Sequence, residues 1–140
     1  MTLLPVFKNL HVLLVEDTYF NQLLAIEFLT SKIDNVQIDI AENGQIALDR
    51  IAEASYDFIL MDVKMPVMDG LETTRNIRNH ADFVTRKLPI VGLTANALPE
   101  ELEECRIAGM DRWVTKPINE DELMQAISAV LNGSANELAL

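Results

Sequence analysis

Five polar residues of the sequence each follow a short apolar run, at the point where a chain leaves a buried strand. They are Glu16, Asp17, Asp62, Thr94 and Lys116. Because the carboxyl ends of parallel strands meet at one edge of a sheet, we expect these side chains to lie close together. Three carboxylates, one hydroxyl and one ammonium group would then surround a single open cleft.

These functional groups suit metal-assisted phosphoryl chemistry. Clustered carboxylates raise one another's pKa unless a cation lies among them. Hard oxygen ligands in an open cleft favour Mg²⁺, which retains several waters and takes few carboxylates from the protein. Such an ion would offset the charge of an incoming phosphoryl group, whose remaining oxygens Lys116 and Thr94 can hold. In this interpretation Asp62 is a nucleophile that becomes an acyl phosphate.

Each of the five residues also has an ordinary structural interpretation. Glu16 and Asp17 can cap the helix that follows them, and Asp62 can be a polar strand end. Thr94 can be a cap or a strand former, and Lys116 a solvated surface charge. These separate explanations do not account for the placement of all five at strand ends on one edge, so we favour the functional interpretation of the set.

The apolar runs before these residues are typical of strands in a parallel sheet. Three runs are continuous and rich in large apolar residues, as expected for strands buried on both faces. They are "HVLLV" at 11–15, "FIL" within 58–61 and "IVGL" at 90–93. Two weaker runs are "VQIDI" at 36–40, which alternates like an edge strand, and "RWVT" at 112–115.

Segments with helical spacing alternate with these strands, at 19–32, 43–53, 69–79, 98–108 and 119–131. Asp69, Pro99 and Asn119 favour helix starts at three of them. Strand and helix repeat five times with short connections, which predicts an α/β domain with helices on both faces of a parallel sheet.

The first helical segment is apolar around much of its circumference. Leu23 and Ile26 follow the spacing of one face, while Phe20, Leu24 and Phe28 widen it. We therefore expect most of this stripe to lie in the core.

Length and composition indicate one soluble domain. The chain has 140 residues, of which 49% are hydrophobic, and it has no apolar run of the length that a membrane span needs. Its first residues do not resemble a signal peptide, so we expect a cytoplasmic location without membrane insertion. A net charge of -11 disfavours direct binding of nucleic acid. We expect the single cysteine, Cys105, to be a buried apolar residue.

The sequence resembles a known family in four motifs with matching order and separation. They are "LLVEDTYFNQ", "ILMDVKMPVMDG", "VGLTANA" and "WVTKP". This set is similar to the receiver (CheY-like) domain of two-component response regulators over residues 8–131, which leaves 1–7 as an N-terminal extension and 132–140 as a tail or linker start. The resemblance implies a flavodoxin-like, doubly wound sheet of five parallel strands in the order 2-1-3-4-5, with five flanking helices. "VEDTYFNQ" and "GLTANAL" are most like receivers of hybrid sensor histidine kinases.

Carried over by position, the resemblance implies a role for each site residue. Asp62 is the phosphoacceptor, and Asp17 is a direct Mg²⁺ ligand. Glu16 acts on the ion through a water, and the backbone carbonyl of Lys64 completes the protein ligands. The remaining roles belong to the switch hydroxyl Thr94, the phosphate-contacting Lys116, and Pro117, whose peptide bond is typically cis in this family.

Two positions depart from the usual pattern of the family. Trp113 stands where Phe or Tyr is usual, so the expected rotation of this residue with Thr94 has an uncertain amplitude, and a static core aromatic is an equal alternative. The basic Lys64 borders the expected path of the attacking water, and it can change the lifetime of the acyl phosphate in either direction.

The resemblance also implies the partners. The phospho-donor is a histidine kinase or a histidine phosphotransfer protein, and we expect it to dock on the first helix near Tyr19, Phe20 and Leu23. The domain itself is regulatory, supporting only its own phosphotransfer and dephosphorylation as a monomer or weak dimer, although a hybrid parent chain could be a kinase. The run of glutamates at 100–104 favours a solvated face over a surface for a basic partner.

Three other classes of protein use related features. A phosphatase with an aspartyl-phosphate intermediate would have an aspartate two residues after its nucleophile, where this chain has Lys64. A nucleotide-binding flavodoxin-like module would need a phosphate loop in place of the acidic "EDTYFNQ". A degenerate receiver that only binds partners ranks third, because all five expected positions are filled.

Overall fold

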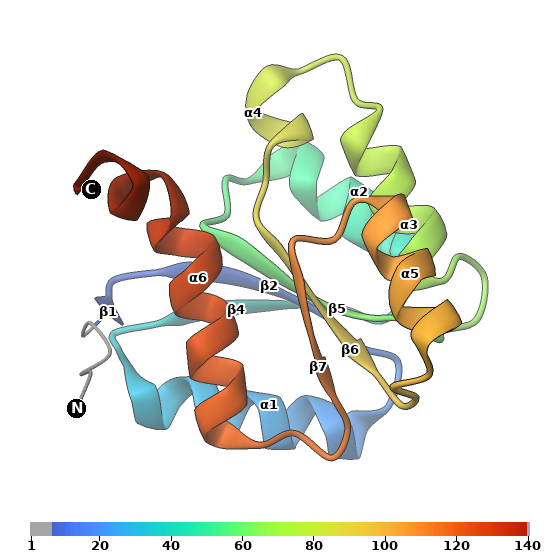
Figure 1. Ribbon diagram of the computed structural model, residues 1–140. Coiled ribbons are helices and arrows are strands. Elements are labelled where there is room, and N and C mark those ends of the chain that lie inside the picture. Colours follow the sequence, from blue (N-terminus) through green and yellow to red (C-terminus); the bar gives the residue numbers. More distant parts are fainter. Residues whose placement is uncertain (1–6, 140) are drawn as a thin grey trace.

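The centre of the computed structural model is a five-stranded parallel sheet (Figure 1). The structure describes the backbone of residues 7–139 and side chains as far as residue 131. The order of the strands is β4-β2-β5-β6-β7, which is 2-1-3-4-5 when they are counted along the chain. The strands are β2 (His11–Val15), β4 (Gln37–Ala41), β5 (Phe58–Asp62), β6 (Ile90–Thr94) and β7 (Arg112–Thr115). The predicted flavodoxin-like order is confirmed.

Helices cover both faces of the sheet, as the alternation of strand and helix predicts. The side chains of α1 (Tyr19–Lys32) and α6 (Glu120–Ala139) pack in one core cluster. Those of α2 (Gly44–Glu53), α3 (Gly70–Arg78) and α5 (Pro99–Ala108) pack in the other. Helix α6 continues beyond the expected boundary at residue 131, so the predicted tail is helical in its backbone as far as Ala139.

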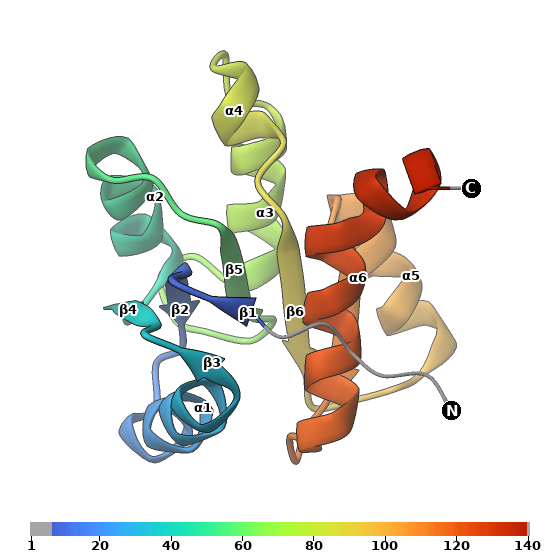
Figure 2. The same cartoon turned by 90° about the vertical axis from the view of Figure 1, so that its left-hand side faces the viewer.

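The structure contains three short elements that the sequence pattern does not predict. Helix α4 (Phe83–Arg86) adds a sixth helix to the expected five. Strands β1 (Phe7–Lys8) and β3 (Ile33–Asp34) form a separate two-stranded parallel sheet near one end of α1 (Figure 2). Elements of two to four residues are too short for an apolar period, so hydrophobic periodicity cannot reveal them. Residues 1–6 of the expected N-terminal extension lie outside the described residues.

The core stripe expected of α1 is wrong in part. Phe20, Leu23 and Leu24 are exposed, whereas Ile26 and Phe28 are partly buried and pack against the core cluster that contains α1 and α6. The fully buried residues of this helix are Gln22, Ala25 and Leu29. The buried residues follow the i, i+3, i+7 spacing of one helical face. Because apolar residues also occupy other faces of α1, the sequence pattern does not identify the face that meets the sheet.

The central strands are buried on both faces, which explains their continuous apolar sequences. Side chains alternate along a strand, so Leu13 and Met61 enter one core cluster while Leu14 and Leu60 enter the other. Cys105 is buried, as expected. Among residues 7–139, no helix is long and apolar enough to cross a bilayer.

A half-buried arginine joins four segments at the end of the sheet where α3 ends. The guanidinium group of Arg78 donates hydrogen bonds to the carbonyl oxygens of Gly109, Arg86 and Leu88 at 2.7–2.9 Å. It also pairs with Asp111 at 2.8 Å, and the same carboxylate oxygen accepts from the backbone N–H of Ile90. Arg78 therefore ties α3 to the segment containing α4, to the end of α5 and to the start of β7.

Replacing Arg78 with methionine should lower the free energy of unfolding by about 3 kcal/mol, because three carbonyl oxygens and one carboxylate lose their donor. Urea denaturation followed by circular dichroism measures this change. Arg106→Met is the matched control, since Arg106 pairs only with the exposed Glu103 on its own helix and its loss should have no measurable effect. Equal stability of the Arg78 variant and the wild type would contradict this role.

Candidate active site

Three carboxylates converge at the carboxyl edge of the sheet. Asp62 ends β5, and Glu16 and Asp17 follow β2, which pairs with β5 in parallel register. Each residue offers a carboxylate oxygen, and these oxygens lie within 4.8 Å of one another. Glu16 and Asp62 are only 1% and 4% exposed, whereas Asp17 is exposed. The predicted cluster therefore has two buried members and one that faces solvent.

Lys116 reaches the two buried carboxylates from β7. Its Nζ lies 3.0 Å from Oδ1 of Asp62 and 3.2 Å from Oε1 of Glu16. Its backbone N–H donates to the carbonyl oxygen of Thr94 at 2.7 Å, and the peptide bond to Pro117 is cis, as predicted. Burial lowers the pKa of Lys116, but the two carboxylates raise it more, so the net shift is upward. The ammonium group is thus charged and held between its partners.

The carboxyl group of Glu16 has a raised pKa. Desolvation raises its pKa, and the nearby Asp62 adds to the increase, while Lys116 only partly opposes it. The backbone N–H of Asp17 donates to Oε2 of Glu16 at 2.9 Å. The buried amide of Gln22 donates to the backbone carbonyl of Glu16 at 2.8 Å and so holds the chain at this point.

The site has the donor chemistry of a magnesium centre. Carboxylate oxygens are the ligands that Mg²⁺ prefers, and a cleft with one solvent-facing carboxylate leaves room for the waters that it retains. Lys116 supplies one positive charge to a cluster of three carboxyl groups, so it alone does not compensate their negative charge when all are ionised. A divalent cation beside Asp17 and Asp62 would complete this compensation.

Thr94 lies at the same edge, but its hydroxyl group is engaged elsewhere. It is fully buried, donates to the carbonyl oxygen of Asn96 at 3.0 Å and accepts from the N–H of Asn96 at 3.2 Å. Thr115 lies opposite Thr94 in the register of β6 and β7, and Trp113 lies opposite Gly92. Trp113 is half-buried and packs against the core cluster that contains α5.

The loop between β5 and α3 packs closely against the end of β5. Gly70 begins α3, and a Cβ atom there would meet the carbonyl oxygen of Asp62 at 2.1 Å, so only glycine allows this approach. Val67 has φ of 69°, a conformation in which a β-branched residue is strained, and its side chain is exposed. The side chain of Lys64 is also exposed.

The structure thus brings Glu16, Asp17, Asp62 and Lys116 together and places Thr94 beside them without a contact to the carboxylates. Two residues that hydrogen-bond to site residues were not predicted from the sequence. They are Gln22, which binds Glu16, and Asn96, which binds Thr94. Gln22 lies with Ala25 on the buried face of α1, but the sequence pattern does not identify that face and so gives no signal for Gln22. The role of Asn96 depends on a local turn and left no such signal.

Comparison with known proteins gives a consistent result. The family model described as "Response regulator receiver domain" matches residues 12–128. The two-component response regulator ORR41 of Oryza sativa subsp. japonica is 40% identical over 118 residues, which are 83% of this chain and 90% of that protein. Histidine kinase 5 of Arabidopsis thaliana is 35% identical over 145 residues, covering 86% of this chain but only 16% of the kinase. The chain therefore spans less than two thirds of some relatives and most of others.

Solved structures show the same architecture. The receiver domain of the sensor histidine kinase PA1611 from Pseudomonas aeruginosa PAO1 has a TM-score of 0.77 and 38% identity, over 89% of this chain and 98% of that one. That structure was described with a magnesium ion coordinated in its active site cleft. The chemotaxis protein CheY4 of Vibrio cholerae also has a TM-score of 0.77, with 30% identity, over 87% of this chain and 98% of that one.

The raised pKa of Glu16 predicts how stability depends on pH without metal. A raised pKa in the folded state stabilises the protein below the ordinary pKa of glutamate, and this stability is lost as pH rises through the folded value. Glu16→Gln should therefore unfold at higher urea than the wild type at neutral pH in a chelator, and the difference should shrink below about pH 4.

Glu104→Gln, an exposed change on α5, is the control and should leave the urea midpoint unchanged at both pH values. Addition of Mg²⁺ should stabilise the wild type more than Glu16→Gln, because a ligand that binds only the folded state adds to its stability. A Glu16→Gln variant that is less stable than the wild type at every pH would show that desolvation is not the main effect.

Proposed function

Because the chain belongs to the response regulator receiver family, we propose that Asp62 is its phosphoacceptor and that phosphorylation requires Mg²⁺. The chain is a receiver domain of two-component phosphorelay systems. The observation that carries the proposal is the pairing of Lys116 with Asp62 at 3.0 Å inside the cluster of Glu16 and Asp17. This arrangement provides a nucleophile, a cation site and a charged donor within one cleft.

The metal would be held by groups of this chain alone. Asp17 and Asp62 would bind it directly, Glu16 would act through a water, and the backbone carbonyl of Lys64 would complete the protein ligands. When bound, the ion supplies positive charge that offsets the negative charge of the transferred phosphoryl group. The 4.8 Å spread of the three carboxylate groups supports this assignment.

The transfer itself requires little from the protein beyond position and charge. A carboxylate oxygen of Asp62 attacks the phosphorus of a phosphohistidine, the new P–O bond forms, the N–P bond breaks, and the imidazole leaves with the bonding electrons. Lys116 then exchanges its contact with Asp62 for a phosphoryl oxygen. Burial of Asp62 and Glu16 keeps competing water away and strengthens these interactions.

Helix α1 is the proposed docking surface for the phospho-donor. The exposed side chains of Tyr19, Phe20 and Leu23 lie on the first turns of this helix, directly after the acidic pair. Exposed apolar side chains grouped beside a reactive centre are typical of an interaction site. The proposed donor is a histidine kinase or a histidine phosphotransfer protein.

The proposed response to phosphorylation involves Thr94 and Trp113. The hydroxyl group of Thr94 would leave Asn96 and bind a phosphoryl oxygen, and Trp113 would repack in the space next to β6. The half-buried position of Trp113 between the core and solvent supports such a movement. The changed surface of α5, β7 and α6 would control a partner or an attached domain, so the role is regulatory rather than enzymatic.

The relatives suggest two kinds of protein in which this domain can occur, a response regulator and a longer histidine kinase. Its match covers 90% of the response regulator ORR41 but only 16% of the much longer histidine kinase 5. In either case we propose a cytoplasmic location, where a kinase can draw on ATP.

The first test is chemical labelling. Incubation with acetyl phosphate and Mg²⁺ should add one phosphoryl group to the wild type, as measured by intact mass. Asp62→Asn should show no adduct, and Lys116→Met should slow labelling by about a hundredfold, because it removes one charged donor. Glu104→Gln is the control and should react at the rate of the wild type. A full adduct on Asp62→Asn would overturn the assignment of the phosphoacceptor.

The second test follows the single tryptophan of the chain. Beryllofluoride, which mimics a phosphoryl group, should quench or shift the emission of Trp113 in the presence of Mg²⁺. Thr94→Ala should bind beryllofluoride with a smaller change in emission, because the hydroxyl group that couples the site to β7 is absent. Unchanged emission of the wild type, with binding shown by fluorine NMR, would show that Trp113 is a static core residue.

A further inference from the structure

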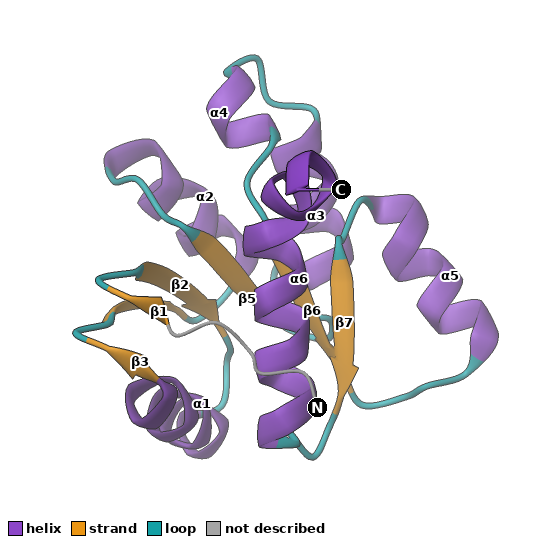
Figure 3. Ribbon diagram, turned by 60° about the vertical axis from the view of Figure 1, so that its left-hand side comes forward, coloured by secondary structure: helices purple, strands orange, loops and turns teal. Residues whose placement is uncertain are grey.

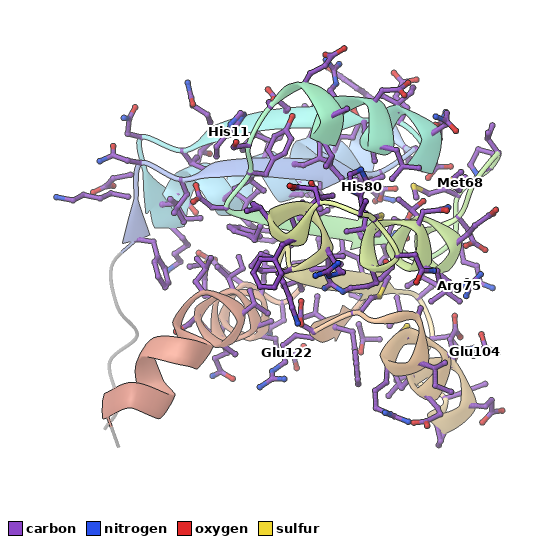
Figure 4. The ribbon with its side chains drawn as sticks, turned by 90° about the horizontal axis from the view of Figure 1, so that it is seen from above. His11, Met68, Arg75, His80, Glu104 and Glu122 are labelled. Atoms are coloured by element: carbon purple, nitrogen blue, oxygen red, sulfur yellow. The ribbon has the colours of Figure 1, made fainter. Side chains whose placement is uncertain are left out.

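A second hollow lies between α2, α3 and α4, away from the acidic cluster. It is a pocket of about 660 Å³ with a mixed lining, in which Leu48, Ile51, Val84 and Leu88 form the apolar part. Figure 4 shows the labelled His80, another lining residue, between α2 and α4. A pocket of this volume can take a large side chain or a small ligand.

The topology places this pocket at the opposite end of the sheet from Asp62. All five strands are parallel and end at the edge that carries the acidic cluster, so the helices that follow them run back and end at the other edge. The lining residues of the pocket come from the C-terminal parts of α2 and α3, from the turn after α3 and from α4. Figure 3 shows these three helices on the same side of the molecule. A ligand there would not contact the phosphorylation site.

Helix α4 does not add to the core. None of its residues is buried, and Phe83 and Val84 are 62% and 69% exposed. It is nonetheless held at both ends: Asp82 accepts hydrogen bonds from the N–H and the hydroxyl group of Thr85, and Arg78 binds the carbonyl oxygen of Arg86. The segment thus presents two large apolar side chains beside an apolar pocket.

The charges around the pocket favour a cationic partner. Glu53 and Asp82 carry carboxylates among its lining residues. The C-terminal ends of α2 and α3 add partial negative charge, because helix dipoles point their negative ends there. None of the described residues that line the pocket is a lysine or an arginine. His80 of the lining and the nearby Arg86 interact with Asp82, and Arg86 and Lys87 are placed over the ring of Phe83, at 5.3 and 6.0 Å from its centre.

We propose that this pocket is a docking site for a basic amphipathic helix of a partner protein. An apolar side chain of that helix would fill the space between Ile51 and Val84, and its lysines or arginines would lie beside Glu53 and Asp82. A second copy of this chain is the less favourable occupant, because two molecules of net charge -11 repel each other. Since the pocket lies opposite Asp62, docking is independent of phosphorylation and serves as a constant tether.

A titration followed by ¹⁵N NMR tests this proposal. The probe is a short synthetic amphipathic helix of leucine and lysine, and its counterpart of leucine and glutamate is the charge-reversed reference. The lysine peptide should shift amides of α2, α3 and α4, and the glutamate peptide should not bind. Glu53→Lys and Val84→Asp should each weaken binding about tenfold, through lost charge attraction and lost apolar contact respectively.

Glu100→Lys is the matched control, since it makes the same change of charge on α5, at another exposed position. It should leave the affinity within about twofold of the wild-type value, as should beryllofluoride with Mg²⁺. Equal losses for Glu53→Lys and Glu100→Lys, amide shifts centred on α1 or α5, or no binding would each overturn the proposal. If the wild type alone forms dimers and Val84→Asp abolishes them, the occupant of the pocket is a second copy of this chain. That result would also overturn the proposal. None of these outcomes affects the labelling of Asp62.

Discussion

The ion pair of Lys116 with two buried carboxylates is the interaction on which the active edge of this molecule depends. Glu16 and Lys116 are 100 residues apart in the chain, yet their side chains lie 3.2 Å apart. Asp62 shares the same ammonium group. Burying two carboxylates is costly unless a positive charge accompanies them, and the lysine supplies only one. Burial raises the pKa of Glu16, and the neighbouring Asp62 raises it further. The excess of carboxyl groups over the one ammonium group favours a cation at this site.

The sheet provides the rigidity that this arrangement requires. β2 and β5 are buried on both faces along most of their length, so the residues that end them have little freedom to move. Gly70 brings the start of α3 against the carbonyl oxygen of Asp62, and Gln22 holds the carbonyl oxygen of Glu16 from α1. Two helices on opposite faces of the sheet therefore position adjacent carboxylates, as the proposed phosphoryl transfer requires.

The two ends of the sheet differ in their chemistry. The carboxyl end carries buried charge and the tightly drawn loop of Val67, as is common where strain is kept for function. The opposite end carries Arg78, which joins α3 to the segment of α4, to α5 and to β7. The hydrogen bond of Arg78 to Arg86 holds α4 in place, and α4 forms one wall of the pocket that we propose as a docking site. The contacts that stabilise this end of the sheet therefore also shape the proposed docking site.

The parallel sheet with helices on both faces and the grouping of Glu16, Asp17, Asp62 and Lys116 could be predicted from sequence patterns, whereas the strand order followed only from the resemblance to receiver domains. Continuous apolar runs identify buried parallel strands, and a polar residue after each run must lie at the shared carboxyl edge. Both predictions use local patterns, because in a parallel sheet every strand ends at the same edge. The charged residues after each strand indicate the site, because a charge is rarely buried within a strand and so marks the point where the strand leaves the core.

The buried face of α1, the presence of α4 and the partner of the Thr94 hydroxyl group could not be predicted. Apolar residues surround α1, so its orientation is decided by which side chains fit closely against the sheet, and these are Ala25, Leu29 and the polar Gln22. Helix α4 has no apolar period, and its stability comes from hydrogen bonds of Asp82 and of the distant Arg78. Local pattern determines where strands and strand-end charges lie, whereas packing and hydrogen bonds between distant segments determine which surfaces remain free for partners.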